Sequence, residues 1–148
     1  MGSPRAQQDG SGAHLDAEQL VGLAAQVPPA VEAGLAVEDE LIAQGYFTYR
    51  SGLDAAESIL SLIDPPTAIF ATNDDMALGV LTLAHRIGLR VPEDLSVTGF
   101  DDTSASLTSW PPLTTVRQPL EEMGRTVVDA LAQDARDTPE FRFTLIER

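Results

Sequence analysis

The chain has 148 residues, of which 43% are hydrophobic and 22% charged, a composition typical of a globular domain. Its formal net charge of −14 would repel a phosphate backbone, which argues against nucleic-acid binding by this chain itself. It contains no cysteine and no lysine, which excludes disulfides, thiolate catalysis, Cys-ligated metal sites, Walker-type phosphate lysines and Schiff-base lysines.

The first 40 residues carry weak signals. Residues 1–14 are polar, Gly-rich and without periodicity, and we expect a disordered head. Residues 15–40 are expected to be a helical segment: a helix is predicted over 16–26, because Leu20, Leu23 and Ala24 have helical spacing after a possible capping box at Asp16 and Gln19, whereas residues 30–40 fit either a weak helix or a linker. The segment "ELIAQGYF" at 40–47 then predicts a short strand.

Helices and strands alternate after that point. The pattern predicts a helix over 51–63 with Ser51 as its cap, a buried strand over 67–72, and a helix from Asn73 to Ile87 that Gly88 ends. A second buried strand is expected over 95–100, followed by a loop over 101–115. A helix begins at Pro119, with Leu120, Met123, Val127 and Leu131 expected to face inward, and residues 141–148 form a last strand. This order predicts an α/β fold with a doubly wound parallel sheet.

Polar side chains follow both buried strands. Asn73 ends the first strand and Asp101 ends the second, and ligands of such folds bind beyond the carboxyl ends of the strands. An amide and a carboxylate suit a ring of sugar hydroxyls, Gln118 adds a further amide, and Phe47 or Tyr46 would cover an apolar ring face. The sequence therefore favours a small-molecule site at this edge.

Structural explanations exist for each of these residues. Asn73 and Asp74 are good helix-initiating residues, the pair Asp101 and Asp102 fits an ordinary polar turn, Gln118 could be a simple cap, and Phe47 could belong to the core. Carboxylates at strand tips also suit Mg²⁺ or phosphoryl transfer, but no lysine is present to balance phosphate charge. We therefore predict no metal site, no cofactor and no enzymatic activity.

The stretch "PPTAIFATNDDMALGVLTLAHRIGLRVPEDLSVTGFDD", with "PPLTTVRQPLEEMGRTVVDALA" after it, resembles the sensor domain of LacI/GalR-type transcriptional regulators. The resemblance covers residues 41–148, which we expect to be a partial sensor with a periplasmic-binding-protein-like fold. It implies that a sugar or nucleoside effector contacts Asn73, Asp101 and Gln118, with Phe47 stacked on the ring. Within the pair that ends the second strand, Asp101 is expected to contact the ligand and Asp102 to form the turn.

The resemblance also implies a homodimer. The expected interface residues lie on the helix after the first buried strand and in the loop after the second: Leu78, Ala105, Ser106, Thr108 and Trp110. The DNA-binding head of the family has no counterpart in this chain, so contact with DNA is expected only through a head that the chain lacks. A family pocket arginine upstream of Gly45 also has no counterpart.

Three further interpretations remain open. A sugar-binding protein of a transport system would have the same fold, but the N-terminus lacks the apolar segment of a secretory signal. An enzyme using the carboxylates would have to work without Lys or Cys, and a non-functional gene fragment is the third alternative. No apolar run is long enough for a membrane helix, so we expect a cytoplasmic protein with no membrane contact.

Overall fold

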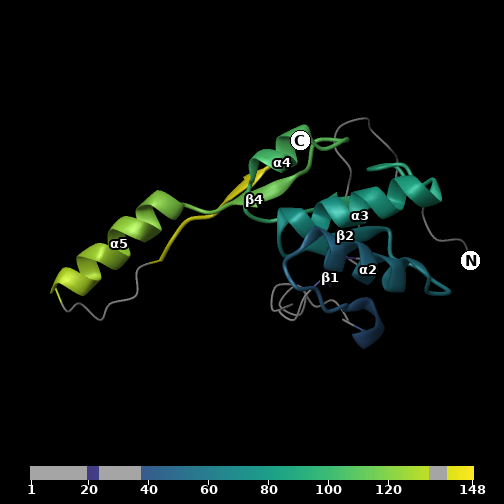
Figure 1. Cartoon of the computed structure of the whole chain (residues 1–148), viewed down its shortest axis with the longest axis horizontal. Coiled ribbons are helices and arrows are strands. Elements are labelled where there is room, and N and C mark those ends of the chain that lie inside the picture. The colour runs from purple at the N-terminus through teal and green to yellow at the C-terminus, as the bar shows by residue number, and fades with distance from the viewer. Residues whose placement is uncertain (1–19, 24–37, 134–139) are drawn as a thin grey trace, which may run out of the picture.

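The computed structural model describes the backbone of residues 20–23 and residues 38–133 and 140–148 (Figure 1). Its centre is a three-stranded parallel sheet in the order β1-β2-β3, formed by Leu20–Leu23, Ala68–Ala71 and Ser96–Thr98. Ala68 in the middle strand pairs with Leu20 on one side and with Ser96 on the other. The two buried strands predicted from the sequence are thus confirmed as neighbours, and the parallel α/β fold with them.

The helix predicted over residues 16–26 is wrong for Leu20–Leu23, which form β1. A short apolar run fits both a helix face and a buried strand, so spacing alone does not decide between them. Here the edge of β2 offers a row of hydrogen-bonding groups, and β1 pairs with it in parallel. The predicted disordered head at 1–14, and residues 15–19 and 24–37 of the predicted helical segment, lie outside the described residues.

Helices α2 and α3 pack closely against each other (Figure 1). α2 spans Tyr49–Leu60 and α3 spans Asp74–Ile87, which ends at Gly88 in the left-handed conformation (φ 83°) as predicted. A Cβ on Gly79 would lie 2.4 Å from the carbonyl oxygen of Tyr49, and a Cβ on Gly52 would lie 2.4 Å from the Met76 Cα. The two helices can therefore approach this closely only because glycine stands at both positions.

The segment before α2 differs from prediction. A 3₁₀ turn, Asp39–Leu41, and irregular chain stand where a strand was expected at 40–47. Thr48 caps α2 by accepting a hydrogen bond from the Ser51 backbone N–H, and Ser51 completes a reciprocal capping box. Ser51 is thus part of the cap but not the cap residue itself.

The hydrophobic core lies between these helices and the sheet. Its largest fully buried apolar side chains come from α2, β2, α3 and the segments just before β3 and β4: Ile59, Ile69, Met76, Val80, Leu95 and Leu113. This core fixes the ends of β2 and β3, and so positions the polar residues that follow them.

The rest of the chain forms an extended arm. After the short helix α4 (Ser104–Thr108), β4 (Thr115–Arg117) leaves the sheet edge and pairs antiparallel with β5 (Thr144–Ile146). Helix α5 (Leu120–Gln133) stands apart from the sheet at the far end of this two-stranded ribbon (Figure 1).

The expectation that the apolar residues of α5 face inward is wrong for Leu120, Val127 and Leu131, whereas Met123 is half-buried. Leu120, Val127 and Leu131 are 64%, 57% and 80% exposed. Their helical spacing is real, because it defines one apolar face, but spacing predicts only that a face is apolar and not what covers it.

Candidate functional site

Asn73 lies where β2 ends and α3 begins. Its side-chain oxygen accepts a hydrogen bond from the Met76 N–H at 2.9 Å, which makes it the N-cap of α3. Its amide nitrogen donates to the backbone carbonyl of Phe47 at 3.2 Å. The structural explanation of Asn73 as a helix cap is therefore confirmed, and the same side chain also holds the Phe47 loop in place.

Phe47 lies on that loop with a left-handed backbone (φ 57°), and its ring is 65% exposed. It is therefore not a core residue. A non-glycine residue in this conformation is uncommon, and here the hydrogen bond from Asn73 to its carbonyl holds it. The result is an aromatic ring presented to solvent beside the end of β2, with Tyr46 equally exposed next to it.

Asp101 and Gln118 contact each other directly. Gln118 Nε2 donates to Asp101 Oδ1 at 2.6 Å, so the end of β3 is tied to the residue that follows β4. The Asp101 backbone has a positive φ of 108° and donates its N–H to the Val116 carbonyl at 2.9 Å. Burial raises the pKa of Asp101, the Gln118 hydrogen bond opposes that rise, and the carboxylates of Asp74 and Asp75 add to it.

A buried carboxylate, Asp74, joins the elements around this pair. It has no solvent exposure, and it accepts from the Thr103 N–H at 2.6 Å, the Thr103 hydroxyl at 3.0 Å and the Thr115 hydroxyl at 2.6 Å. A Cβ on Gly99 would lie 2.4 Å from Asp74 Oδ1, so glycine is required at that position. The sequence pattern predicts Asp74 only as a helix-initiating residue, because its partners Thr103 and Thr115 lie 29 and 41 positions away.

Asp102 does more than form a turn. It has a left-handed backbone (φ 52°), as a turn residue would, but its carboxylate also pairs with Arg117 at 2.5 Å and with Arg148 at 2.6 Å. The hydrogen bond from Arg148 first, and that from Arg117 next, hold the pKa of Asp102 below its usual range. Arg148 also donates to the Ser106 hydroxyl and the Leu113 carbonyl, so it ties the end of β5 to α4.

The four predicted ligand contacts thus form two bonded pairs, Asn73 with Phe47 and Asp101 with Gln118. The two strand ends are joined by the Asp74 N–H, which donates to the Phe100 carbonyl at 2.8 Å. The roles of these residues in ligand binding remain a prediction.

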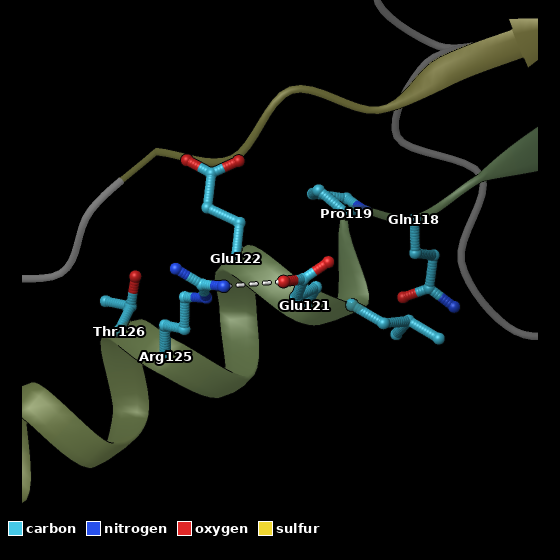
Figure 2. Close-up of a pocket in the computed structure, with 7 residues that line it drawn as sticks. Gln118, Pro119, Glu121, Glu122, Arg125 and Thr126 are labelled. Carbon is cyan, nitrogen blue, oxygen red and sulfur yellow. Dashed lines mark hydrogen bonds and ion pairs between the residues drawn. The ribbon is translucent and has the colours of Figure 1, made fainter.

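A broad open hollow of about 710 Å³ lies on the arm side of Gln118 (Figure 2). It is lined by Gln118, Pro119, Leu120, Glu121, Glu122, Arg125 and Thr126. Figure 2 shows Arg125 paired with Glu121 one helical turn away, at 2.7 Å. Gln118 is the only predicted site residue in this hollow, so the hollow adjoins the strand-end site but does not contain it.

The predicted interface residues do not all reach the surface. Trp110 is 81% exposed and Thr108 is exposed, whereas Leu78 and Ala105 are half-buried. Ser106 is fully buried and its hydroxyl donates to the Thr103 carbonyl at 2.7 Å, so its side chain does not contribute to the exposed surface of the chain. The large exposed apolar side chains of this region are Trp110 and Leu107. The dimer itself stays a prediction.

Neither a metal-ligand cluster nor a membrane-spanning helix is present among the residues that the structure describes. Residues 38–133 and 140–148 hold no group of three or more His, Asp or Glu side chains arranged for a metal ion. Over the same residues, no helix combines the length and the apolar character needed to cross a membrane.

The fold and the strand-end residues define an α/β domain of the periplasmic-binding-protein type. The family model described as "Periplasmic binding protein-like domain" matches residues 14–145. The chain therefore belongs to the periplasmic binding protein-like domain family, and the relatives that it matches include LacI-family regulators. The match begins within the segment that the sequence analysis left outside the resemblance.

Three comparisons illustrate this membership. The chain is 49% identical over 92 residues to the HTH-type transcriptional repressor CytR of Escherichia coli K12, covering 62% of this chain and 27% of that protein. A LacI-family regulatory protein from Chloroflexus aggregans has a similar structure, with a TM-score of 0.75, 29% identity, and 88% of this chain matched to 54% of that one. The structure of the transcriptional regulator CelR in complex with cellobiose is also similar, with a TM-score of 0.72 and 30% identity. The match covers 88% of this chain and 46% of that one. The chain thus spans about a quarter of the length of the E. coli repressor.

Proposed function

We propose that this chain is part of the effector-binding sensor domain of a LacI-type transcriptional regulator, and that it binds a sugar or nucleoside at the ends of β2 and β3. The observation that carries the proposal is the pairing of Asp101 with Gln118, joined to the Asn73 region through Asp74. Strand ends of parallel α/β sheets are where such folds bind ligands.

The chemistry of the four residues fits that ligand class. The Asp101 carboxylate has acceptor capacity beyond its one bond to Gln118, and both amides have further donors and acceptors. The exposed ring of Phe47 would cover the apolar face of a sugar or base, held there by Asn73. One relative of similar fold is a complex with cellobiose, which supports a carbohydrate as the ligand.

In the full regulator, binding would be linked to DNA through dimerisation. We propose that Trp110 and Leu107 contribute to a homodimer interface, because large exposed apolar side chains are typical of subunit contacts. Effector binding would then change the relative placement of the two subunits, a coupling between distant sites. DNA contact would come from a head outside this chain, and such a regulator would act in the cytoplasm without catalysing a reaction.

The test is ligand-observed NMR of the purified chain with cellobiose, glucose, ribose and uridine. We expect saturation transfer from the protein to at least one of them, and its loss in an Asp101→Asn variant. Asn suits this change because it tolerates the positive φ of residue 101 better than Ala. Glu57→Gln, on the exposed face of α2, removes one carboxylate elsewhere and should leave the signal unchanged. Equal signals from the wild type and Asp101→Asn would place any binding outside the strand-end site.

A further inference from the structure

The Asp101 carboxylate lies in an excess of negative charge. Its hydrogen-bond partner, Gln118, is neutral, so this bond does not balance its charge. Asp74 and Asp75 are close enough for their carboxylates to raise the pKa of Asp101 further, beyond the rise caused by burial. A ligand at Asp101 therefore meets three carboxylates that act in the same direction.

The neighbouring arginines offset this charge only in part, because both are bound to Asp102, and these three side chains together leave one positive charge against the three carboxylates. Arg117 and Arg148 both bond the Asp102 carboxylate, at 2.5 Å and 2.6 Å. Arg148 is also only 13% exposed, and its remaining donors bond Ser106 and the Leu113 carbonyl. Releasing Arg148 for a ligand would leave a buried carboxylate with less compensation.

Helix N-termini commonly bind anions, but backbone amides at the N-terminus of α3 already have hydrogen-bond partners within the protein. The Met76 N–H donates to Asn73 and the Asp74 N–H to the Phe100 carbonyl, while Asp74 and Asp75 occupy the first turn. A phosphate bound there would need those amides and would meet those carboxylates. On the α5 side, Arg125 is paired with Glu121, and Glu122 adds negative charge to the same hollow (Figure 2).

We infer that the strand-end site binds uncharged polyhydroxylated ligands and rejects their phosphorylated forms. This inference rests on the proposed function and narrows its ligand class. Hydroxyl groups can donate to Asp101 at any ligand charge, whereas a phosphate dianion near three carboxylates is repelled by each. For a phosphate within about 8 Å of Asp101, this repulsion corresponds to binding at least about tenfold weaker than that of the neutral compound.

The experiment compares matched pairs on the whole 148-residue chain at low salt. The probes are glucose with glucose 6-phosphate, ribose with ribose 5-phosphate, and uridine with uridine 5′-monophosphate, with Kd values from ligand-observed NMR titration. The expected result is a Kd at least about tenfold higher for each phosphorylated member of a pair that binds, with the ratio falling as salt is added. Asp75→Asn should reduce the ratio, because it removes one of the three charges and leaves the Asp101 carboxylate in place for the ligand, whereas Glu57→Gln should preserve it.

The outcomes separate this inference from the function on which it rests. If a phosphorylated compound binds as well as its neutral partner or better, the charge selectivity is overturned while ligand binding at the site stands. A ratio unchanged in Asp75→Asn also overturns it, because the discrimination then arises elsewhere. If neither member of any pair binds, the proposed function of this chain fails, and the inference fails with it.

Discussion

The body of the molecule (the three-stranded sheet with α2 and α3) and its arm (β4, α5 and β5) both contain amphipathic helices. Within the described residues, the body buries the apolar faces of its helices and the arm leaves that of α5 exposed. In the body, α2 and α3 meet at glycine positions, and residues such as Ile59 and Val80 are almost fully buried. In the arm, α5 has an equally regular apolar face, but Leu131 is 80% exposed. Amphipathic spacing is therefore common to both regions, and packing within the described residues distinguishes them.

The two regions are joined by a few specific contacts. The rings of Phe100 and Phe143 lie 5.9 Å apart, Gln118 bonds Asp101, and Arg148 returns from the end of β5 to Asp102. The candidate ligand-binding pair thus lies at the junction, with Asp101 on the body and Gln118 on the arm. A ligand that bonds both side chains would bind preferentially to one relative placement of body and arm, which is how binding shifts a conformational equilibrium.

The largest difference in stability between the body and the arm is expected when a glycine of each is replaced by alanine. Gly79→Ala would bring a Cβ to 2.4 Å from the Tyr49 carbonyl oxygen and force α2 and α3 apart. We expect a loss of about 3 kcal/mol or more in the free energy of unfolding. Gly124→Ala in α5 is the matched control, because no atom lies within 4 Å of the added Cβ. It should stabilise the chain by up to about 1 kcal/mol through helix propensity. Urea unfolding followed by circular dichroism measures both, and equal effects would contradict the comparison.

Asp74 should have the next largest effect. Asp74→Ala removes the acceptor for the Thr103 N–H and for the Thr103 and Thr115 hydroxyls, all at a fully buried position. Leaving such donors unsatisfied costs about 3 kcal/mol in total. The neighbouring Asp75 is exposed, so Asp75→Ala should cost at most about 1 kcal/mol, from the lost charge in the first turn of α3. A stable Asp74→Ala protein in thermal unfolding would show that Asp74 does not hold these elements together.

Asp74 also illustrates what sequence could and could not predict. The strands over 67–72 and 95–100 and the helix from Asn73 to Gly88 were predictable, because each combines an apolar pattern with a local start or stop signal. The polar residues at the strand ends were predictable for the same reason. The bonds of Asp74 to Thr103 and Thr115 join residues 29 and 41 positions apart, and local pattern carries no information about such pairings.

The same limit explains the errors. The run at Leu20–Leu23 suits either a helix or a strand until its partner β2 is known. The apolar face of α5 predicts a burial that depends on what lies over it. Arg148 gave no local signal at all, since its partners Asp102 and Ser106 lie 46 and 42 positions away.

Arg148 should have an intermediate effect, because it links arm and body. Arg148→Met keeps the length of the side chain but removes its bonds to Asp102, Ser106 and the Leu113 carbonyl, and we expect a loss of about 2 kcal/mol. Arg142→Met is the control, since Arg142 is exposed on the same arm, and it should change stability by less than about 0.5 kcal/mol. Chemical denaturation at pH 7 measures both, and a neutral Arg148→Met would mean that the arm is held to the body without it.

The pH dependence of the same variant gives a second measurement. Because the folded-state pKa of Asp102 lies below its unfolded value of 3.8, its ion pairs stabilise the protein above that pH. That contribution is lost as the pH falls below 3.8 through the folded-state pKa. Arg148→Met should therefore lose less stability than the wild type between pH 5 and about pH 2. Asp101, whose raised pKa acts in the opposite direction, is common to both proteins, so the difference between the two curves reports on Asp102.

The smallest effect is expected on the apolar face of α5. Leu131 is 80% exposed, so Leu131→Ser removes little buried surface and should change the free energy of unfolding by no more than about 0.5 kcal/mol. Leu95→Ser, at a position with 1% exposure in the body, should lose several times as much, because it removes a buried side chain and leaves a cavity. Both values come from urea unfolding at equal protein concentration. A loss above about 1.5 kcal/mol for Leu131→Ser would mean that α5 packs its apolar face against another part of the chain in solution, because an exposed leucine has no such contact to lose.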